Sequence, residues 1–203
     1  MSLPGFLHPP PADLASRSLP LVDHAGPWQR LHPLQYAAIY FDSSSQYRFN
    51  PTDGAYGVLY CGENLECCVL ETVLRLDTPQ HTTFRSLSRR LDLAPRALSE
   101  IATHRPLRLV DLSGDGLAMI GAHAAICSCP YDQVRPWSRA LWAHPDQPDG
   151  LLFRARHNPR LASVALFDHA SSAIFARTTI PLLALPARQL ADILNRYRIS
   201  LRP

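Results

Sequence analysis

The chain has 203 residues, of which 46% are hydrophobic, and a formal net charge of +3. This length is typical of one domain, and the basic residues are dispersed, so the composition argues against direct binding to nucleic acid. No apolar run is long enough to span a bilayer, and the N-terminus lacks the pattern of a secretory signal. We therefore expect a cytoplasmic protein that acts on neither membranes nor nucleic acid.

The five cysteines do not follow the spacing of familiar zinc modules. The nine histidines include no His-x-x-x-His pair that would support a metal site on a helix. We therefore expect reduced, mostly buried thiols and no metal site. The cysteines are Cys61, Cys67, Cys68, Cys127 and Cys129.

The first part of the chain is rich in proline. Residues 1–27 contain six prolines, which predict an extended arm without regular structure, although Leu19, Leu21 and Val22 are apolar enough to lie against the body. The folded domain is then expected over residues 28–203. Its first strands are predicted at 28–32, 36–41 and 56–60, from their aromatic and β-branched content.

A helix is predicted directly after the third strand. Gly62 ends that strand, Asn64 has the side chain of an N-cap, and apolar residues recur at helical spacing from Leu65 to Leu76. Glu71 falls among the less polar positions of this helix, where a carboxylate needs either a partner or a chemical role. A surface ion pair with Arg75, four residues further on, is the structural alternative.

The second half of the chain alternates less regularly. Residues 77–105 are ambiguous, with apolar spacing that suggests helical pieces between Phe84 and Ile101, broken at Pro95. Because strands and helices do not alternate, the sequence predicts an α+β fold in one compact domain. Pro136 is expected in the first turn of its helix. The later elements are predicted as strand 107–112, helices 117–126 and 131–143, strands 151–154, 164–167 and 180–185, and helix 187–198.

Several segments, taken in order, resemble the RES domain, a family named after a characteristic arginine, glutamate and serine. The resemblance covers about residues 28 to 170 and also includes LRLVDLSGDGLAMIGA. The segments that carry it best are Arg30 in WQRLHP, Arg48 in YRFNP, Gly57 and Tyr60 in YGVLYCGE, Glu71 in CCVLETVLR, and DGLLFRARHNP followed by ALFDHA.

The resemblance implies a split, mixed sheet similar to that of ADP-ribosyltransferase toxins. It also implies the toxin of a bacterial toxin–antitoxin pair, with NAD as substrate and no prosthetic group. Such an enzyme breaks the nicotinamide–ribose bond, as a glycohydrolase or a phosphorylase does. The implied partner is a small Xre-like antitoxin that blocks the NAD pocket, and a homo-oligomer within that complex is compatible with the resemblance.

The residue types suit this chemistry. The guanidinium groups of Arg30 and Arg48 match phosphate oxygens, so both are candidate clamps for the pyrophosphate of NAD. Tyr60, or Tyr47, offers a flat ring for nicotinamide. Departure of nicotinamide leaves positive charge on the ribose, and a carboxylate such as that of Glu71 stabilises this charge.

One position departs from the family pattern. Where the family reads roughly Tyr-x-Ser-Arg, this sequence reads Phe153-Arg154-Ala155-Arg156, so Ala155 stands at the position of the family serine. An alanine side chain makes no hydrogen bond. Three explanations stay open: a serine removed by design, a natural variant of lower activity, or a degenerate member that only binds. Ser163 and Ser128 are candidate substitutes for the serine.

Two alternatives to NAD cleavage are also open. The first is an ADP-ribosyltransferase that uses NAD to modify a protein target. The second is a non-catalytic, RES-like binding module, for which the arm of residues 1–27 would provide a partner surface.

Overall fold

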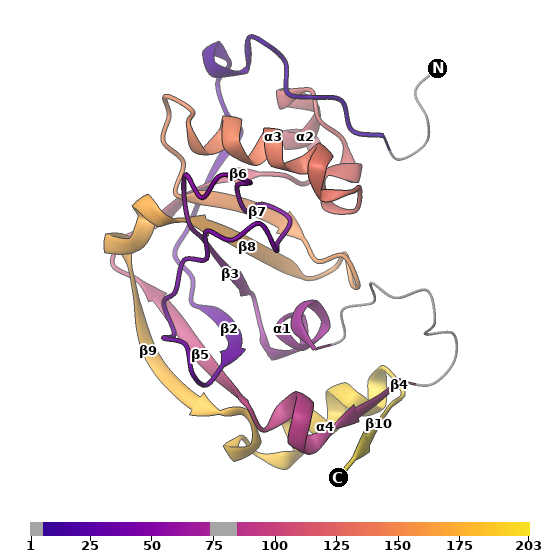
Figure 1. The fold of residues 1–203 in the computed structure, drawn as a ribbon. Coiled ribbons are helices and arrows are strands. Elements are labelled where there is room, and N and C mark those ends of the chain that lie inside the picture. Colours follow the sequence, from indigo (N-terminus) through magenta and orange to yellow (C-terminus); the bar gives the residue numbers. More distant parts are fainter. Residues whose placement is uncertain (1–5, 74–84) are drawn as a thin grey trace.

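The structure, a computed structural model, describes residues 6–73 and 85–203. Within these residues, eight strands form one sheet in the order β1-β6-β7-β8-β3-β2-β5-β9, and β10 pairs with β4 in a second sheet. The large sheet curls past α1, with α2 and α3 at one end of the molecule and α4 with the small sheet at the other (Figure 1). This arrangement confirms the predicted α+β fold with a mixed sheet.

The helices and strands have the following bounds. The helices are α1 (Leu65–Thr72), α2 (Gly114–Ile120), α3 (Tyr131–Trp142) and α4 (Ala187–Arg196). The strands are β1 (Leu21–His24), β2 (Trp28–Pro33), β3 (Val58–Gly62), β4 (Arg85–Ser88), β5 (Arg96–Thr103), β6 (Leu107–Asp111), β7 (Gly150–Arg154), β8 (Ala162–Phe167), β9 (Ile174–Pro181) and β10 (Ile199–Arg202).

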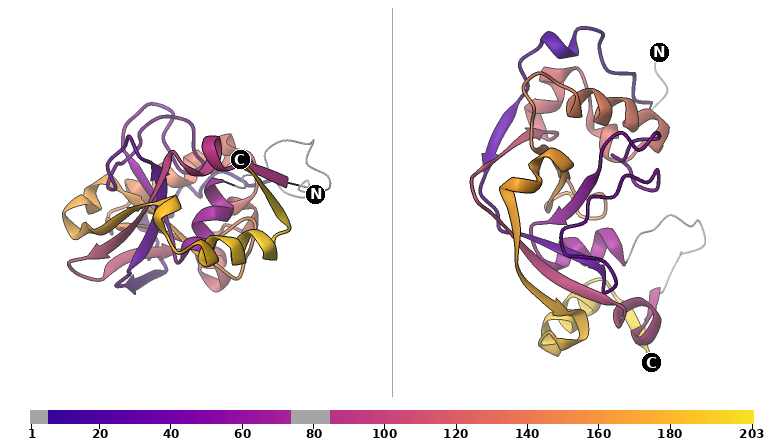
Figure 2. Two further views of the ribbon diagram at one scale, coloured as in Figure 1. Left: turned by 90° about the horizontal axis from the view of Figure 1, so that it is seen from below. Right: turned by 60° about the vertical axis from the view of Figure 1, so that its left-hand side comes forward.

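The large sheet is split between β2 and β3. These antiparallel strands pair only at Gln29 and Gly62, whereas β2 pairs with β5 from Trp28 to Pro33. Each strand is therefore held firmly on its other side, and the two separate beyond the single shared pair. Strands β5 and β9 are antiparallel and lie side by side, and they extend to the end of the molecule that carries α4 (Figure 2, right). Among the described strands of this sheet, only β6 and β7 are parallel neighbours.

Both faces of the large sheet are covered by apolar side chains. Alternation along β3 shows this, because Val58 belongs to a cluster with Trp137 beneath α3, whereas Leu59 belongs to a cluster with Trp28 on the opposite face. A further cluster joins α1 to α4 and the small sheet. The site described below lies where the first and the last of these clusters meet the split.

The N-terminal segment packs on the body and is partly regular. The prediction that proline denies it regular structure is wrong for Leu21–His24, which form β1 and pair with β6. Six residues separate Pro20 from Pro27, and the first four of them are enough for this short edge strand. The carbonyl of His8 also accepts a hydrogen bond from Nε1 of Trp137 at 2.7 Å. The expected contact of Leu19 with the body is confirmed, since this residue is buried in the cluster beneath α3.

The helix α1 begins as predicted. The side chain of Asn64 accepts a hydrogen bond from the N–H of Cys67 at 2.8 Å, which caps the helix. A Cβ atom on Gly62 would lie 2.9 Å from the Cβ of Cys67, so a glycine is required where the strand passes the helix. Arg75 and Leu76 lie outside the described residues, and with them the alternative ion pair to Glu71.

The predicted strand at 36–41 is wrong. This segment is a loop, and the carbonyl groups of Ala37, Ala38 and Tyr40 accept hydrogen bonds from the guanidinium of Arg30 instead of from a neighbouring strand. Ala38 and Phe41 pack against the Trp28 cluster. The apolar side chains that suggest a strand are therefore partly buried, although the segment forms no strand-to-strand hydrogen bonds as a β-strand would.

The predicted helical pieces between residues 84 and 101 are mostly wrong. A single π-helical turn occupies Arg89–Leu93, but β4 precedes it and β5 follows it. In β5, Ala97, Ser99 and Ile101 are buried, as expected for a strand that pairs on both sides. Spacing of three between apolar residues suits a helix, and tertiary pairing overrides this local preference.

Three boundaries also differ from the predictions. Helix α2 begins three residues earlier than expected, at Gly114, and ends six residues earlier, at Ile120. Gly121 caps it with a positive φ of 81°. Pro136 lies inside α3 and not in its first turn. The last strand of the large sheet is β9, which ends at Pro181 and does not continue to residue 185. The predicted strands around β2, β3, β6, β7 and β8 and the helices around α3 and α4 are confirmed.

No helix within residues 6–73 and 85–203 combines the length and the apolar character needed to cross a membrane.

Asp149 connects β6 to β7 through a buried charge. Its side chain is 5% exposed, and it accepts hydrogen bonds from both Nη atoms of Arg105 at 2.6 and 2.7 Å and from the N–H of Arg108 at 2.8 Å. Burial acts to raise the pKa of Asp149, but the hydrogen bonds from Arg105 and Arg108 outweigh it and lower that pKa overall. The charged form is therefore the stabilising one.

We expect Asp149→Asn to lower the free energy of unfolding by about 2 kcal/mol at pH 7, because two charge-assisted hydrogen bonds are weakened. Since the pKa is lower in the folded state, this stabilisation is present above about pH 4 and is lost as the pH falls through the folded-state pKa. Urea unfolding at pH 7 and at pH 3 measures both effects.

A matched control is Asp53→Asn. Asp53 pairs with Arg139 at 2.6 Å, but both side chains are about half exposed. This variant should lose much less stability than Asp149→Asn does at pH 7, because solvent screens an exposed ion pair. Equal losses in the two variants at pH 7 would contradict the structural importance of Asp149.

Candidate functional site

A cavity of about 570 Å³ fills the split between β2 and β3. This volume lies within the range of small-molecule sites, about 300 to 1,000 Å³. The cavity is lined from β2, β3, α1, the 34–57 loop, the start of α3 and the loop between β7 and β8. Five of the six residues predicted for the site line it, namely Arg30, Tyr47, Arg48, Tyr60 and Glu71.

Arg30 lines the cavity but already has partners. Its guanidinium donates to the carbonyls of Ala37 at 3.1 Å, Ala38 at 2.5 Å and Tyr40 at 3.3 Å. Burial lowers the pKa of Arg30, and the nearby Cys61 and other groups oppose this. Arg30 therefore satisfies loop carbonyls that have no ladder partner, and this structural role competes with the predicted pyrophosphate clamp.

Tyr60 and Asn50 join the floor of the cavity to its loop. The hydroxyl of Tyr60 donates to Oδ1 of Asn50 at 3.0 Å and accepts from the N–H of Phe49 at 2.8 Å. Asn50 is fully buried and donates from Nδ2 to the carbonyls of Asp42 and Ser44. Burial raises the pKa of the Tyr60 phenol, so this hydroxyl stays protonated at neutral pH. The ring of Tyr60 is thus held rigidly.

Arg48 lies at the end of the cavity near α3. Its Nη1 donates to the carbonyl of Cys129 at 2.6 Å, and its guanidinium carbon lies 4.9 Å from the ring centroid of Tyr131. Burial lowers the pKa of Arg48, Tyr131 opposes this, and the like charge of Arg156 adds to it. Two guanidinium groups in one partly buried place favour an anion between them.

Glu71 lines the cavity from the C-terminal end of α1. Its Oε1 accepts a hydrogen bond from the N–H of His157 at 3.3 Å. Burial raises the pKa of the Cys127 thiol, which the charge of Arg48 lowers and the charge of Glu71 raises. Arg48, Glu71 and Cys127 all line this cavity, so the predicted carboxylate and the predicted arginine share one site.

Ala155 is the predicted site residue that does not line the cavity. It is 1% exposed, and its N–H donates to the carbonyl of Leu161. Its neighbours Arg156 and His157 do line the cavity. Of the two candidate substitutes for the family serine, Ser163 lines the cavity with its Oγ 3.2 Å from Sγ of Cys67, whereas Ser128 is exposed and is not among the lining residues.

The charge of the cavity is unbalanced. Among the described residues, its lining includes four arginines, the fourth being Arg96, but only two carboxylates, Asp42 and Glu71. Burial lowers the pKa of Arg96, as it does for Arg30 and Arg48. Unbalanced, partly desolvated cations attract an anionic ligand.

Sequence reasoning missed Arg96, Arg156 and Tyr131 as cavity residues. Arg96 lies in a stretch whose structure was ambiguous, and Arg156 lies in a loop where an arginine carries no local signal. Tyr131 starts α3, and only the packing of that helix brings it over Arg48.

The thiols in the cavity are poor nucleophiles. Burial raises the pKa of Cys61 to about 12 and that of Cys67 to about 11, so both are protonated at neutral pH. All five cysteines are free and four are buried, which confirms the prediction of mostly buried thiols. Within the described part of the chain, no three His, Cys, Asp or Glu side chains come together as a metal site.

We expect Asn50→Ala to lower the free energy of unfolding by about 3 kcal/mol, since it leaves the carbonyls of Asp42 and Ser44 and the hydroxyl of Tyr60 without this partner. Urea unfolding measures the loss. Asn195→Ala, at an exposed position of α4, is the control and should change stability by less than about 0.5 kcal/mol. A loss no larger than that of the control would refute the role of Asn50.

Comparisons with known proteins agree with the fold. The model of the RES domain matches residues 27–188. The curated "Probable toxin y4kH" of Sinorhizobium fredii (strain NBRC 101917 / NGR234) is 30% identical over 111 residues, which are 54% of this chain and 86% of that protein. The crystal structure of the M. tuberculosis MbcT–MbcA toxin–antitoxin complex contains a chain of similar fold, with a TM-score of 0.65 and 14% identity over 85% of this chain and 93% of that chain. The family match spans most of the sequence, and the chain therefore belongs to the RES domain family.

Proposed function

We propose that this protein is the toxin of a toxin–antitoxin pair and that it cleaves the nicotinamide–ribose bond of NAD. Membership of the RES domain family supports the proposal, as does the similarity to a protein described as a probable toxin. The solved structure of similar fold comes from a toxin–antitoxin complex, which supports an antitoxin as the partner.

The observation that carries the proposal is a single cavity that holds a carboxylate, an aromatic floor and an excess of arginine. NAD needs each of these features. Its pyrophosphate is anionic, its nicotinamide is flat, and its ribose becomes positive as nicotinamide leaves. The guanidinium groups of Arg48 and Arg156 suit the pyrophosphate, Tyr60 or Tyr47 suits the nicotinamide, and Glu71 suits the ribose.

In the proposed reaction, the bond from the ribose carbon to the pyridinium nitrogen breaks, and its electron pair leaves with neutral nicotinamide. The carboxylate of Glu71 stabilises the positive charge that develops on the ribose. The oxygen of water or of phosphate then bonds to that carbon, and with water the proton goes to solvent. The products are nicotinamide and ADP-ribose, or its 1-phosphate.

The contacts of Arg30 favour a different role for this residue than pyrophosphate binding. Arg30 holds the 34–57 loop through three carbonyl groups, so we propose that it shapes the cavity, while Arg48 and Arg156 provide the main attraction for the pyrophosphate. An antitoxin that covers the mouth of the cavity would exclude NAD.

The loss of NAD over time tests the proposal. We expect the Ala155→Ser variant to consume NAD faster than the parent chain, because the hydroxyl restores a hydrogen-bonding group beside the cavity residue Arg156. Replacing Glu71 with Gln in both backgrounds should lower the rate by about 10²- to 10³-fold while the thermal midpoint of unfolding stays within a few degrees.

The matched control is Glu63→Gln, which neutralises an exposed carboxylate outside the cavity and close to α1. This variant should retain the parent rate. Unchanged turnover in Glu71→Gln would refute the role of Glu71. Absence of NAD consumption from both the parent chain and the Ala155→Ser variant would refute NAD cleavage.

A further inference from the structure

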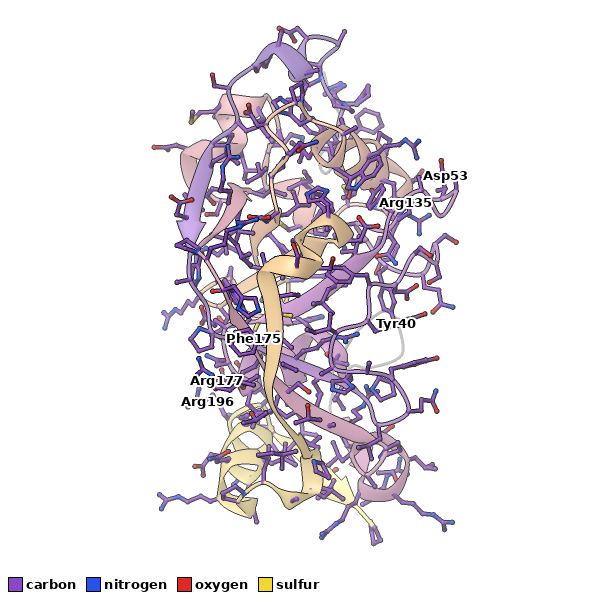
Figure 3. All side chains as sticks on the ribbon, turned by 90° about the vertical axis from the view of Figure 1, so that its left-hand side faces the viewer. Tyr40, Asp53, Arg135, Phe175, Arg177 and Arg196 are labelled. Atoms are coloured by element: carbon purple, nitrogen blue, oxygen red, sulfur yellow. The ribbon has the colours of Figure 1, made fainter. Side chains whose placement is uncertain are left out.

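Two tyrosines form an exposed stack at the mouth of the cavity. The ring centroids of Tyr36 and Tyr40 lie 5.2 Å apart with an interplanar angle of 12°. The two residues are 45% and 44% exposed, and both line the cavity. Figure 3 shows Tyr40 on the side of the molecule that carries Asp53 and Arg135, away from Phe175 and Arg177 on β9. The stack therefore presents aromatic surface to anything that enters the cavity from this side.

The loop that carries the stack is held at several points. The N–H of Tyr36 donates to the carbonyl of Pro33 at 3.1 Å, and the carbonyl of Tyr40 accepts from Nη2 of Arg30 at 3.3 Å. Further along, Asp42 and Val58 exchange two backbone hydrogen bonds of 3.1 and 3.0 Å. Rings fixed in this way lose little conformational entropy when a ligand stacks on them.

The stack and Glu71 come from different elements of the lining. Glu71 belongs to α1, whereas Tyr36 and Tyr40 belong to the loop that follows β2. Tyr60 contacts the ring of Tyr47, with the two ring centroids 5.7 Å apart, whereas Tyr36 and Tyr40 stack on each other. The cavity thus offers flat aromatic surface at two places, with cationic side chains along its lining.

This arrangement matches a ligand with two flat rings joined by an anionic linker. A dinucleotide has this composition, whereas a mononucleotide has only one ring. We propose that the Tyr36–Tyr40 stack is the binding surface for the purine ring of a dinucleotide, so that it distinguishes dinucleotides from nicotinamide mononucleotide. The inference rests on the proposed function, because it assumes that the nicotinamide end of NAD lies beside Glu71.

Titration calorimetry with NAD, nicotinamide mononucleotide and AMP tests the inference. We expect Tyr40→Ala to weaken the binding of NAD and of AMP by about tenfold, with a larger loss in the Tyr36→Ala/Tyr40→Ala double variant, as for the removal of base-stacking rings elsewhere. Binding of nicotinamide mononucleotide should be unchanged. Tyr40→Phe should restore the affinity for NAD, since stacking requires the ring and not the hydroxyl.

The control is Leu34→Ala, which removes an apolar side chain from the same loop that is 50% exposed and does not line the cavity. It should bind all three ligands as the parent does. Unchanged affinity for NAD in the double variant would overturn the inference. An equal loss for NAD and the mononucleotide would also overturn it, because the loop would then act on the whole cavity.

AMP separates this inference from the proposed function. If the parent chain binds AMP but not nicotinamide mononucleotide, and the double variant loses AMP binding, the purine surface is supported although NAD cleavage is not. If AMP fails to bind the parent chain, the purine surface is refuted whatever the result with NAD.

Discussion

The structure depends on the way β2 and β3 pair. The two strands share one residue pair, Gln29 with Gly62. Along the rest of its length, β2 pairs with β5 and β3 pairs with β8. A sheet that stops pairing in its interior leaves backbone groups and side chains facing an open space, and each buried polar group there needs a partner. The cavity, the loop that borders it and the residues that hold the loop all follow from this constraint.

Two side chains meet that requirement. Arg30 on β2 donates to three loop carbonyls, and Asn50 donates to two more while it accepts from the hydroxyl of Tyr60. The loop is thereby shaped by polar contacts with side chains and not by a strand ladder. This explains how residues 36–41 are apolar and yet irregular, and how two tyrosines of this loop reach the mouth of the cavity.

The electrostatics of the cavity favour an anion more strongly than the net charge of the chain would suggest. A charge of +3 spread over 203 residues is small, but four arginines and two carboxylates line one cavity of about 570 Å³. Burial weakens the hydration of these guanidinium groups, so binding of an anion stabilises them more than it would in water. Glu71 lines the same cavity as Arg48, and its negative charge balances part of the charge of the arginines.

The sequence by itself determined the fold class, the family and five of the residues that line the cavity. Local features can be recognised in a sequence. They include amphipathic spacing, the Asn64 cap and the ordered segments around Arg30, Arg48, Tyr60 and Glu71. Only the tertiary structure decided that residues 96–103 form a strand, that Arg30 holds a loop, and that Tyr36, Tyr40, Arg96, Tyr131 and Arg156 share one cavity. These outcomes depend on pairing and packing between residues far apart in the chain, which leave no periodic signal at either position.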